Sequence, residues 1–234
     1  MKSIRYVGDS DGQGWLSVVL DGIDPKLAAN NPGFRVALPQ HLKVNVYKTN
    51  KEREYFEILE GPNNGNKASV KLGLGGKSFL MKDGAHMPAA QVRINRKLQQ
   101  LWFRGPFSAF TDPRNPVPIG VWELEIPDSP HGSPSLYSSY SNYYKTWFRI
   151  RSSRSSDRYL HLGVISHGCI TARPWITDRT NPRLASRSDA ELGLPIPIVS
   201  TVKLIPVPWD ELYRYLIGAR NNAQSVGTII VTDI

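Results

Sequence analysis

The amino-acid sequence predicts a mainly β protein with a minor α component. Glycine, proline and β-branched residues are plentiful, and the 3.6-residue apolar spacing of long helices is nearly absent. The chain has 234 residues, 40% of them hydrophobic, which is ample for one or two packed domains. Two units are expected: a small β-rich module over residues 1–87 and a larger domain over residues 88–234.

The first unit contains five candidate strands, over residues 15–20, 34–38, 42–48, 55–60 and 67–72. Residues 63–66, Asn-Asn-Gly-Asn, predict a hairpin turn between the last two strands. The run 73–78 resembles a phosphate-binding loop, but that motif needs a glycine where Lys71 stands, so a glycine-rich turn is predicted. Nothing in these residues indicates what the module does.

The second unit is expected to contain strands at residues 147–150, 159–165 and 226–231. A Ser/Tyr-rich insertion over 133–145 is interpreted either as a lid over a cleft or as an ordinary surface loop. Residues 180–197 form an irregular stretch that prolines interrupt.

One amphipathic helix is predicted near the end of the second unit, starting by Pro208. Its residues repeat at spacings of three and four: Trp209, Leu212, Tyr213, Leu216 and Arg220. Trp209 and Tyr213 are expected to pack in the core rather than to contact a ligand.

The single cysteine, Cys169, follows His161 by eight residues and His167 by two. A lone thiol makes no internal disulfide, and free cysteines are usually small buried hydrophobes. Nucleophilic catalysis needs a thiolate, a base and backbone N–H groups for the oxyanion. Gly168 lets the backbone bend so that consecutive N–H groups point at one spot. The run 159–171 is therefore a candidate nucleophilic site.

The run Ser166-His167-Gly168-Cys169-Ile170 resembles the active-site signature of YkuD-type L,D-transpeptidases, in which Ser/Thr-His-Gly-Cys follows an upstream histidine. Residues 91–103 resemble the family's opening hairpin, with a polar turn between two strands. Residues 115–124 resemble its Thr-Pro-x-Gly-x-aromatic segment. The resemblance runs in the correct order from about Gln91 to Thr171. It implies a YkuD-like L,D-transpeptidase catalytic domain over 88–234, with a mixed β-sheet or sandwich fold.

Two departures from the common pattern resemble a divergent branch of the family. His161 lies only five residues before Ser166, whereas the family's base histidine usually lies much further upstream. Thr171 stands where Asn or Arg is usual. The shortened spacing resembles a branch that includes L,D-transpeptidase-like effectors of bacterial secretion systems. His131 is the alternative base, but it lies in an expected irregular loop, so His161 on its strand is preferred.

The resemblance implies acyl transfer on the acidic stem peptides of peptidoglycan through a thioester on Cys169, with His161 as base. The acyl group would pass to an amine of a second stem, to a free D-amino acid or to water, which gives cross-linking, exchange or carboxypeptidase trimming. The sequence does not rank these three. Ser166, His167 and Gly168 complete the candidate catalytic set. The candidate substrate-binding residues are Arg173, Thr171 and Gly163.

The charge distribution favours an acidic substrate. The formal net charge is +9, and residues 149–187 hold eight arginines against two aspartates, a balance of +6. Arginine binds carboxylates with two parallel hydrogen bonds, and Arg173 is the arginine nearest Cys169 on its C-terminal side. Two alternatives stay open. The first is a solvated loop holding Arg149, Arg151, Arg154 and Arg158, and the second is a nucleic-acid surface, which no accompanying motif supports.

No organic cofactor and no metal are expected, because the five histidines are scattered and there is no second cysteine. No transmembrane segment or signal peptide is expected either. Peptidoglycan lies outside the bacterial cytoplasm, so the resemblance implies action in the periplasm or cell wall. The chain would arrive there by leaderless specialised secretion, or its leader has been removed. A secretion apparatus and an immunity protein are then the expected partners, and the alternatives of wall builder and toxin stay open.

Two further functions remain open. A cysteine peptidase or amidase with another substrate is one, although in papain-like and related wall peptidases the cysteine precedes the histidine, the reverse of the order here. The other is a cell-wall-binding module that has the same fold and no activity. The short sequence separation between His161 and Cys169 favours this second function.

Overall fold

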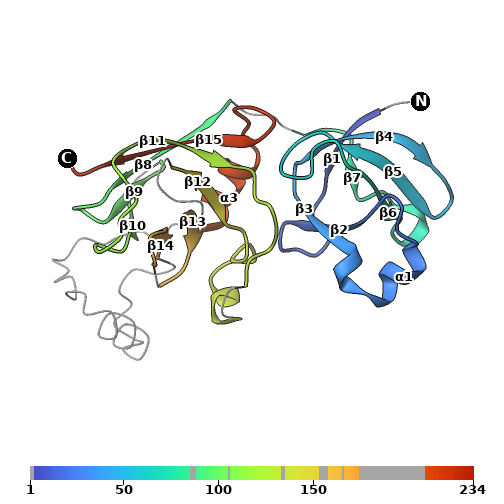
Figure 1. Ribbon diagram of the computed structural model, residues 1–234, viewed down its shortest axis with the longest axis horizontal. Helices are drawn as coiled ribbons and strands as arrows, with labels where there is room; N and C mark the ends of the chain where they lie inside the picture. The colour runs from blue at the N-terminus through green and yellow to red at the C-terminus, as the bar shows by residue number, and fades with distance from the viewer. Residues whose placement is uncertain are drawn as a thin grey trace.

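The computed structural model describes residues 3–84, 88–104, 106–132, 135–152, 158–164, 166–173 and 209–234. The protein is mainly β, as the sequence predicts. It contains two β-sheets that lie one after the other along the long axis of the molecule (Figure 1). The expected irregular stretch over 180–197, Arg154 and Pro208 lie outside the described residues.

The first sheet is entirely antiparallel and has the strand order β3-β2-β6-β5-β4-β1-β7. Its strands are β1 (Ser3–Val7), β2 (Trp15–Leu20), β3 (Arg35–Pro39), β4 (Lys43–Thr49), β5 (Arg53–Ile58), β6 (Lys67–Lys71) and β7 (Leu80–Met81). The five predicted strands correspond to β2 through β6. The strands β1 and β7 and the helix α1 (Pro25–Asn30) of this unit were not predicted. Two short 3-10 helices, η1 (Pro32–Phe34) and η2 (Leu74–Gly76), complete it.

The predicted hairpin turn between β5 and β6 is confirmed. The Ile58 N–H donates to the Asn66 carbonyl at 2.9 Å, and the Gly65 N–H donates to the Ile58 carbonyl at 2.8 Å. Gly65 has φ +88°, a conformation that glycine adopts at little cost. The glycine-rich run 73–78 also turns the chain, with Gly75 at φ +69° inside η2.

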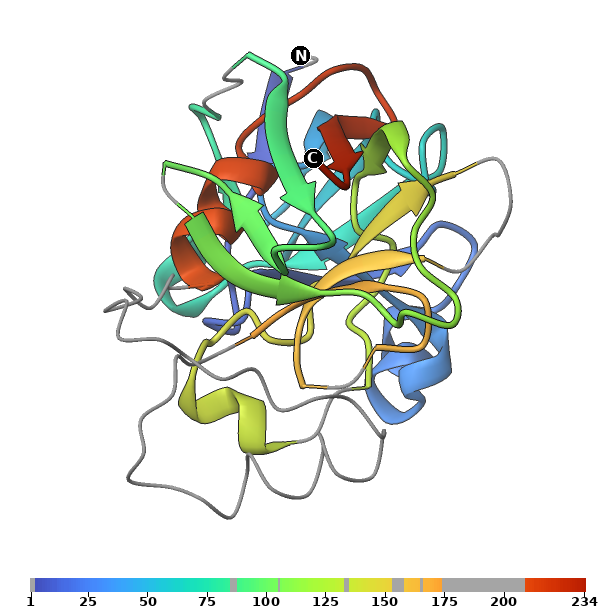
Figure 2. The same cartoon turned by 90° about the vertical axis from the view of Figure 1, so that its left-hand side faces the viewer.

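The second sheet closes into a barrel with the strand order β10-β14-β13-β12-β11-β15-β8-β9. Figure 2 shows it from its own end of the molecule. Its strands are β8 (Ala90–Asn95), β9 (Gln100–Trp102), β10 (Pro106–Phe110), β11 (Gly120–Glu125), β12 (Phe148–Arg151), β13 (Tyr159–Leu162), β14 (Ile170–Ala172) and β15 (Ser225–Thr232). The pairing is mixed, because β13 lies parallel to β14 and β15 lies parallel to β8. The predicted hairpin over 91–103 is formed by β8 and β9, with Asn95 opposite Gln100.

The predicted amphipathic helix is α3 (Trp209–Ile217), and its apolar side is buried. Trp209 and Tyr213 are core residues, as expected. The helix lies between the barrel and the first sheet (Figure 1). There the Tyr213 ring closely approaches Gly14, where a Cβ atom would lie 2.2 Å from the tyrosine hydroxyl oxygen. The helix therefore contributes to both cores.

The contact between the two units includes a buried ion pair. Arg220, just after α3, places Nε 2.9 Å from Oε2 of Glu60, and both side chains are less than a tenth exposed. Nη2 of Arg220 also donates to the His41 carbonyl at 3.0 Å, and the Gly61 N–H donates to the Ala223 carbonyl at 2.8 Å. The strands of the first sheet end before residue 82 and those of the barrel begin after residue 89. That 1–87 and 88–234 are independent domains stays a prediction.

Candidate active site around Cys169

The parallel pairing of β13 and β14 places the candidate base, His161, beside the strand that follows the candidate nucleophile, Cys169. The register sets His161 opposite Thr171 and Leu160 opposite Ile170. Leu160 and Ile170 are fully buried in the hydrophobic core. Since side chains alternate along a strand, His161 and Thr171 lie on the opposite face. Cys169 lies one residue before β14 and two residues before Thr171.

The surroundings of the His161 imidazole fix its tautomer. Nδ1 lies 3.0 Å from the Leu162 carbonyl, which can only accept, so Nδ1 carries the proton. Nε2 is then an acceptor, and it lies 3.3 Å from Oγ1 of Thr171. Burial lowers the pKa of His161 to about 4, against the opposing effect of the Leu162 carbonyl. The ring is therefore neutral at pH 7, with its lone pair on Nε2, which is the form a general base requires.

The ring of His161 belongs to an aromatic stack. Trp147 stacks on His161 with a centroid distance of 4.2 Å and on His131 with a centroid distance of 4.5 Å. Nε2 of His131 donates to Oδ1 of Asp128 at 3.2 Å, and this hydrogen bond lowers the pKa of the Asp128 carboxyl. The structure thus holds His131, the alternative base, against Trp147 and Asp128, whereas His161 lies on the strand beside β14.

The loop that leads into Cys169 is tied down at several points. Gly168 has φ +101°, and a Cβ atom there would lie 2.9 Å from Nδ2 of Asn115. Ser166 Oγ donates to the Cys169 carbonyl at 2.7 Å. Arg158 donates to the Gly168 carbonyl at 3.0 Å, to the Asn115 carbonyl at 3.1 Å and to Asn115 Oδ1 at 2.7 Å. The bend expected at Gly168 is therefore present, and a guanidinium holds it.

Arg158 and Asn115 are the residues of this site that sequence reasoning missed. Asn115 was noted only as the start of a family-like segment, and Arg158 was included in an expected solvated loop. That interpretation of Arg158 is wrong, because its side chain is buried and bonded to the cysteine loop. The sequence signal was weak: an arginine surrounded by serines looks the same whether it faces solvent or a loop carbonyl.

The remaining predicted site residues lie in different environments. His167 is exposed, whereas Cys169 is 8% exposed and Thr171 is fully buried. A Cβ atom at Gly163 would lie 3.3 Å from both His161 Cε1 and Thr171 Cγ2, so Gly163 packs on that pair. The Arg173 guanidinium lies over the Phe110 ring at 4.6 Å. Substrate binding by Thr171, Gly163 and Arg173 stays a prediction.

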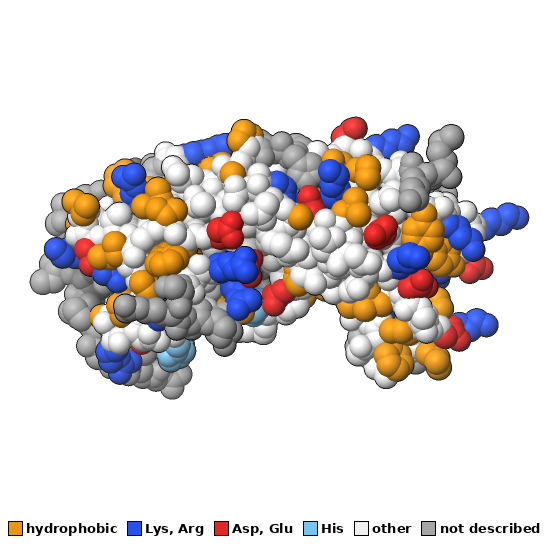
Figure 3. All heavy atoms as spheres, turned by 45° about the horizontal axis from the view of Figure 1, so that its top comes forward, with side chains coloured by type: hydrophobic (Ala, Val, Ile, Leu, Met, Phe, Trp, Pro, Cys, Tyr) orange, Lys and Arg blue, Asp and Glu red, His pale blue; other side chains and the backbone are white. Residues whose placement is uncertain are grey.

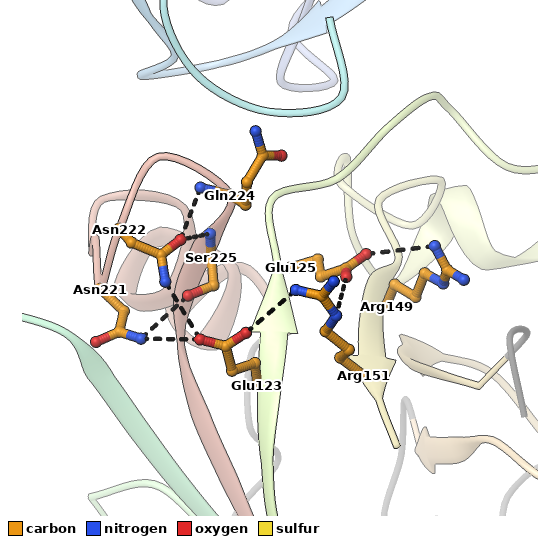
Figure 4. Close-up of polar contacts among 8 residues, drawn as sticks. All are labelled: Glu123, Glu125, Arg149, Arg151, Asn221, Asn222, Gln224 and Ser225. Carbon is orange, nitrogen blue, oxygen red and sulfur yellow. Dashed lines mark hydrogen bonds and ion pairs between the residues drawn. The ribbon is translucent and has the colours of Figure 1, made fainter. Parts of the chain in front are cut away.

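Arg149 and Arg151 belong to a charged network on the outside of the barrel, drawn in Figure 4. Arg149 lies 3.5 Å from Glu125, and Arg151 lies 3.6 Å from Glu125 and 3.7 Å from Glu123. On the face drawn in Figure 3, basic side chains are interspersed with acidic ones. These two arginines are solvent-exposed, as that alternative has it, but they lie in the strand β12 rather than in a loop and pair with acids of β11.

The Ser/Tyr-rich insertion packs against the body of the protein beside the candidate site. It contains the 3-10 helix η3 (Ser135–Ser139), and the buried Tyr137 accepts a hydrogen bond from the Val164 N–H at 3.2 Å. Tyr143 stacks on Tyr213 of α3 at 3.9 Å. Ser141 Oγ donates to Asp210. The described part of the insertion is thus anchored to the barrel and to α3, and a role as a lid stays a prediction.

The described residues contain no group of three or more His, Cys, Asp or Glu side chains placed to hold a metal ion. No helix among them is both long and apolar enough to cross a membrane. No family model, curated protein or solved structure was found to match this chain. The resemblance to the L,D-transpeptidases therefore depends on the motif residues themselves and stays an expectation.

Proposed function

We propose that this chain performs cysteine-dependent acyl transfer on the stem peptides of peptidoglycan, with Cys169 as nucleophile and His161 as base. One observation carries the proposal: His161 lies on β13, which pairs in parallel with β14, the strand that begins one residue after Cys169, and the imidazole presents an unprotonated Nε2 toward β14. The domain over 88–234 would then be a divergent L,D-transpeptidase-like domain in the form of a closed mixed barrel.

In the proposed reaction, His161 Nε2 takes the thiol proton and the sulfur attacks the carbonyl carbon that precedes the terminal D-alanine. The tetrahedral intermediate collapses when the C–N bond breaks, and the proton on Nε2 passes to the leaving amine. The products of this step are free D-alanine and a thioester on Cys169. An amine or water then attacks the thioester and gives its proton to Nε2, which later returns it to the thiolate.

The buried guanidinium of Arg158 supports this chemistry. An imidazole whose pKa is about 4 is a weak base, so the thiolate needs stabilisation from another group. Arg158 donates to the carbonyl of Gly168, the residue just before the cysteine, and a nearby positive charge favours the thiolate. The same contact fixes the Gly168 turn, where backbone N–H groups would receive the oxyanion.

Two observations favour a second function, a cell-wall-binding module without turnover. Cys169 is only 8% exposed, and His161 Nε2 already lies within hydrogen-bond distance of Thr171 Oγ1. For catalysis, the thiol has to replace the Thr171 hydroxyl as the hydrogen-bond partner of His161 Nε2. A binding module needs no such change.

Mass spectrometry after incubation with a carbapenem separates the two functions. For the enzyme we expect one adduct per chain on Cys169, absent from Cys169→Ala and slowed by on the order of 100-fold or more in His161→Gln. His131→Gln is the matched control and should form the adduct at close to the normal rate. Tetrapeptide muropeptides, with and without a D-amino acid, then identify the acceptor. A correctly folded protein that forms no adduct and leaves the muropeptides unchanged contradicts the enzymatic proposal.

A further inference from the structure

The first sheet has a pocket of about 490 Å³ on the face away from its hydrophobic core. All of its lining residues belong to the first unit, and they come from β2, β3, β5, β6, the start of α1 and the residue before β5. Four of the lining side chains are cationic and two are acidic, a balance of +2. The cations are Lys26, Arg35, Arg53 and Lys71, and the acids are Asp24 and Glu52.

The strand register builds this pocket from long side chains around a floor of small ones. Val19 of β2 lies opposite Arg35 of β3 on one side and opposite Ser69 of β6 on the other. Ser69 in turn lies opposite Tyr55 of β5. Residues directly opposite each other share a face of a sheet, so Val19 and Ser69 form a floor between the two outer residues. The backbones of that outer pair are about 14 Å apart, since neighbouring strands are about 4.8 Å apart.

The Arg53 side chain reaches over this floor from β5. Arg53 precedes Tyr55 by two residues in the same strand and therefore lies on the same face. Its Nε donates to the Ser69 hydroxyl at 3.1 Å, and its Nη2 donates to the Ser69 carbonyl at 3.0 Å. The guanidinium is thus held above β6, nearer to Arg35 than its own strand is. Burial lowers the pKa of Arg53, and the positive charge of Arg35 lowers it further, so the two cations act on each other.

Both guanidiniums keep hydrogen-bond donors that the protein does not use. Nε of Arg35 donates to the Ala28 carbonyl at 2.9 Å, and its two Nη atoms form no hydrogen bond with the described residues. In the described part of the chain, Nη1 of Arg53 is without a hydrogen bond as well. These donors are therefore available to a ligand in the pocket.

The two acids of the lining do not neutralise the cations. Among the residues that the structure describes, neither Asp24 nor Glu52 forms an ion pair. Asp24 instead accepts a hydrogen bond from the Lys26 N–H at 2.8 Å. Lys26 and Lys71 are exposed, so their ammonium groups are also accessible. Unpaired cations gathered in one pocket match a ligand with several anionic oxygens.

We propose that this pocket binds a phosphate group, with its oxygens on Arg35, Arg53 and Lys71. A carboxylate is planar and has two oxygens, which a single guanidinium satisfies. Here the donors come from three different strands, and a phosphate offers three acceptor oxygens and a charge of about −1.5 to −2, which balances the lining. Soluble phosphate esters and lipid headgroups both carry this group. The site needs no chemistry at Cys169, so it gives the first unit a binding function of its own.

Calorimetric titration of the full chain with inorganic phosphate tests the site. We expect saturable binding that weakens about tenfold or more in Arg35→Gln, because this change removes hydrogen bonds between charged groups. Lys71→Gln changes an exposed side chain and should weaken binding too, which keeps the test valid if Arg35→Gln does not fold. Ser17→Asp adds a carboxylate to the lining and should abolish binding. Arg5→Gln is the matched control, because Arg5 lies on β1 and is absent from the lining.

Three further ligands test the ligand class and its source. Acetate has one charge and two oxygens, so it should bind about tenfold or more weakly than phosphate, whereas glycerol phosphate should bind as phosphate does. Vesicles of phosphatidylcholine with and without phosphatidic acid then separate the two sources. Cosedimentation that requires phosphatidic acid and is lost in Ser17→Asp supports the site with a lipid headgroup, and glycerol phosphate binding without cosedimentation supports it with a soluble ester. The absence of saturable phosphate binding, equal binding of acetate, or an equal loss in Arg5→Gln overturns the proposal.

Discussion

Replacing Gly168 with alanine tests whether the cysteine loop is rigid. Gly168 has φ +101°, a conformation that costs a residue with a side chain about 1–3 kcal/mol. The new Cβ atom would also lie 2.9 Å from Asn115 Nδ2 and 3.2 Å from the Asn115 carbonyl oxygen. Arg158 holds both oxygens of Asn115, so the asparagine cannot move aside easily. Overpacking of this kind adds about 1–3 kcal/mol.

The expected total for Gly168→Ala is about 3 kcal/mol, measured as the free energy of unfolding in urea. For a chain of this size, that loss lowers Tm by about 6–12 °C. Gly12→Ala is the matched control, because Gly12 has φ +73° and open space where its Cβ would be. Gly12→Ala should lose only the cost of placing alanine at a positive φ, about 1 kcal/mol of unfolding free energy. If the two variants are destabilised equally, the contact with Asn115 is not rigid and the argument for a clamped cysteine loop fails.

Three further substitutions probe the site and the junction of the two units. The pKa of His161 is about 4 in the folded protein against 6.5 in a free side chain, so only the unfolded chain gains this proton between pH 6.5 and 4. The free energy of unfolding should fall by about 3 kcal/mol as the pH drops through that window. In His161→Gln, urea titrations should show no such fall from this residue. Arg158→Met should lose about 2–4 kcal/mol in urea, because it leaves loop carbonyls without donors, whereas the exposed Arg114→Met should stay within about 0.5 kcal/mol. Arg220→Ala should cost about 3–5 kcal/mol by leaving the buried Glu60 unpaired, and an unchanged Tm would contradict the buried ion pair.

Local signals explain why most strands of the first sheet could be predicted. The strand β2 has the predicted bounds Trp15–Leu20, and the turn over 63–66 forms the predicted hairpin. The six-residue helix α1 was missed, although Asp24 caps it by accepting from the Lys26 N–H and Pro25 stands in its first turn. So short a helix has too little apolar periodicity to be recognised.

The closure of the barrel could not be read from local patterns. It depends on pairs distant in sequence, such as β15 with β8, where Gly227 lies opposite Ala90. The sequence of neither strand indicates which strand it pairs with. A Cβ atom at Gly227 would lie 2.0 Å from the Ala90 carbonyl oxygen, so the glycine is required there, yet in the sequence it is only a glycine within a strand.

In the candidate site too, some residues could be predicted from the local sequence and others could not. Cys169, His161 and Gly168 could be chosen from one short run because their residue types and spacing carry the chemistry. Arg158 could not, because its contact with Asn115 spans 43 residues. Thr171 is a candidate substrate-binding residue from its place after Cys169, and the sequence does not show that the register sets it opposite His161. A shift of one residue in that register would turn Thr171 to the opposite face of the strand.

The position of the first unit bears on the function of the whole chain. A module that only tethered the barrel would need no precise contact with it. Here the turn after β5 is held by the Gly61–Ala223 hydrogen bond, and the residue just before it, Glu60, pairs with Arg220. The next residue along the turn, Pro62, lines a pocket together with Arg149 and Gln224 of the second unit. Because burying an ion pair is costly unless its geometry is well fixed, the junction holds that turn in one position. The first unit is therefore held in a fixed position against the barrel.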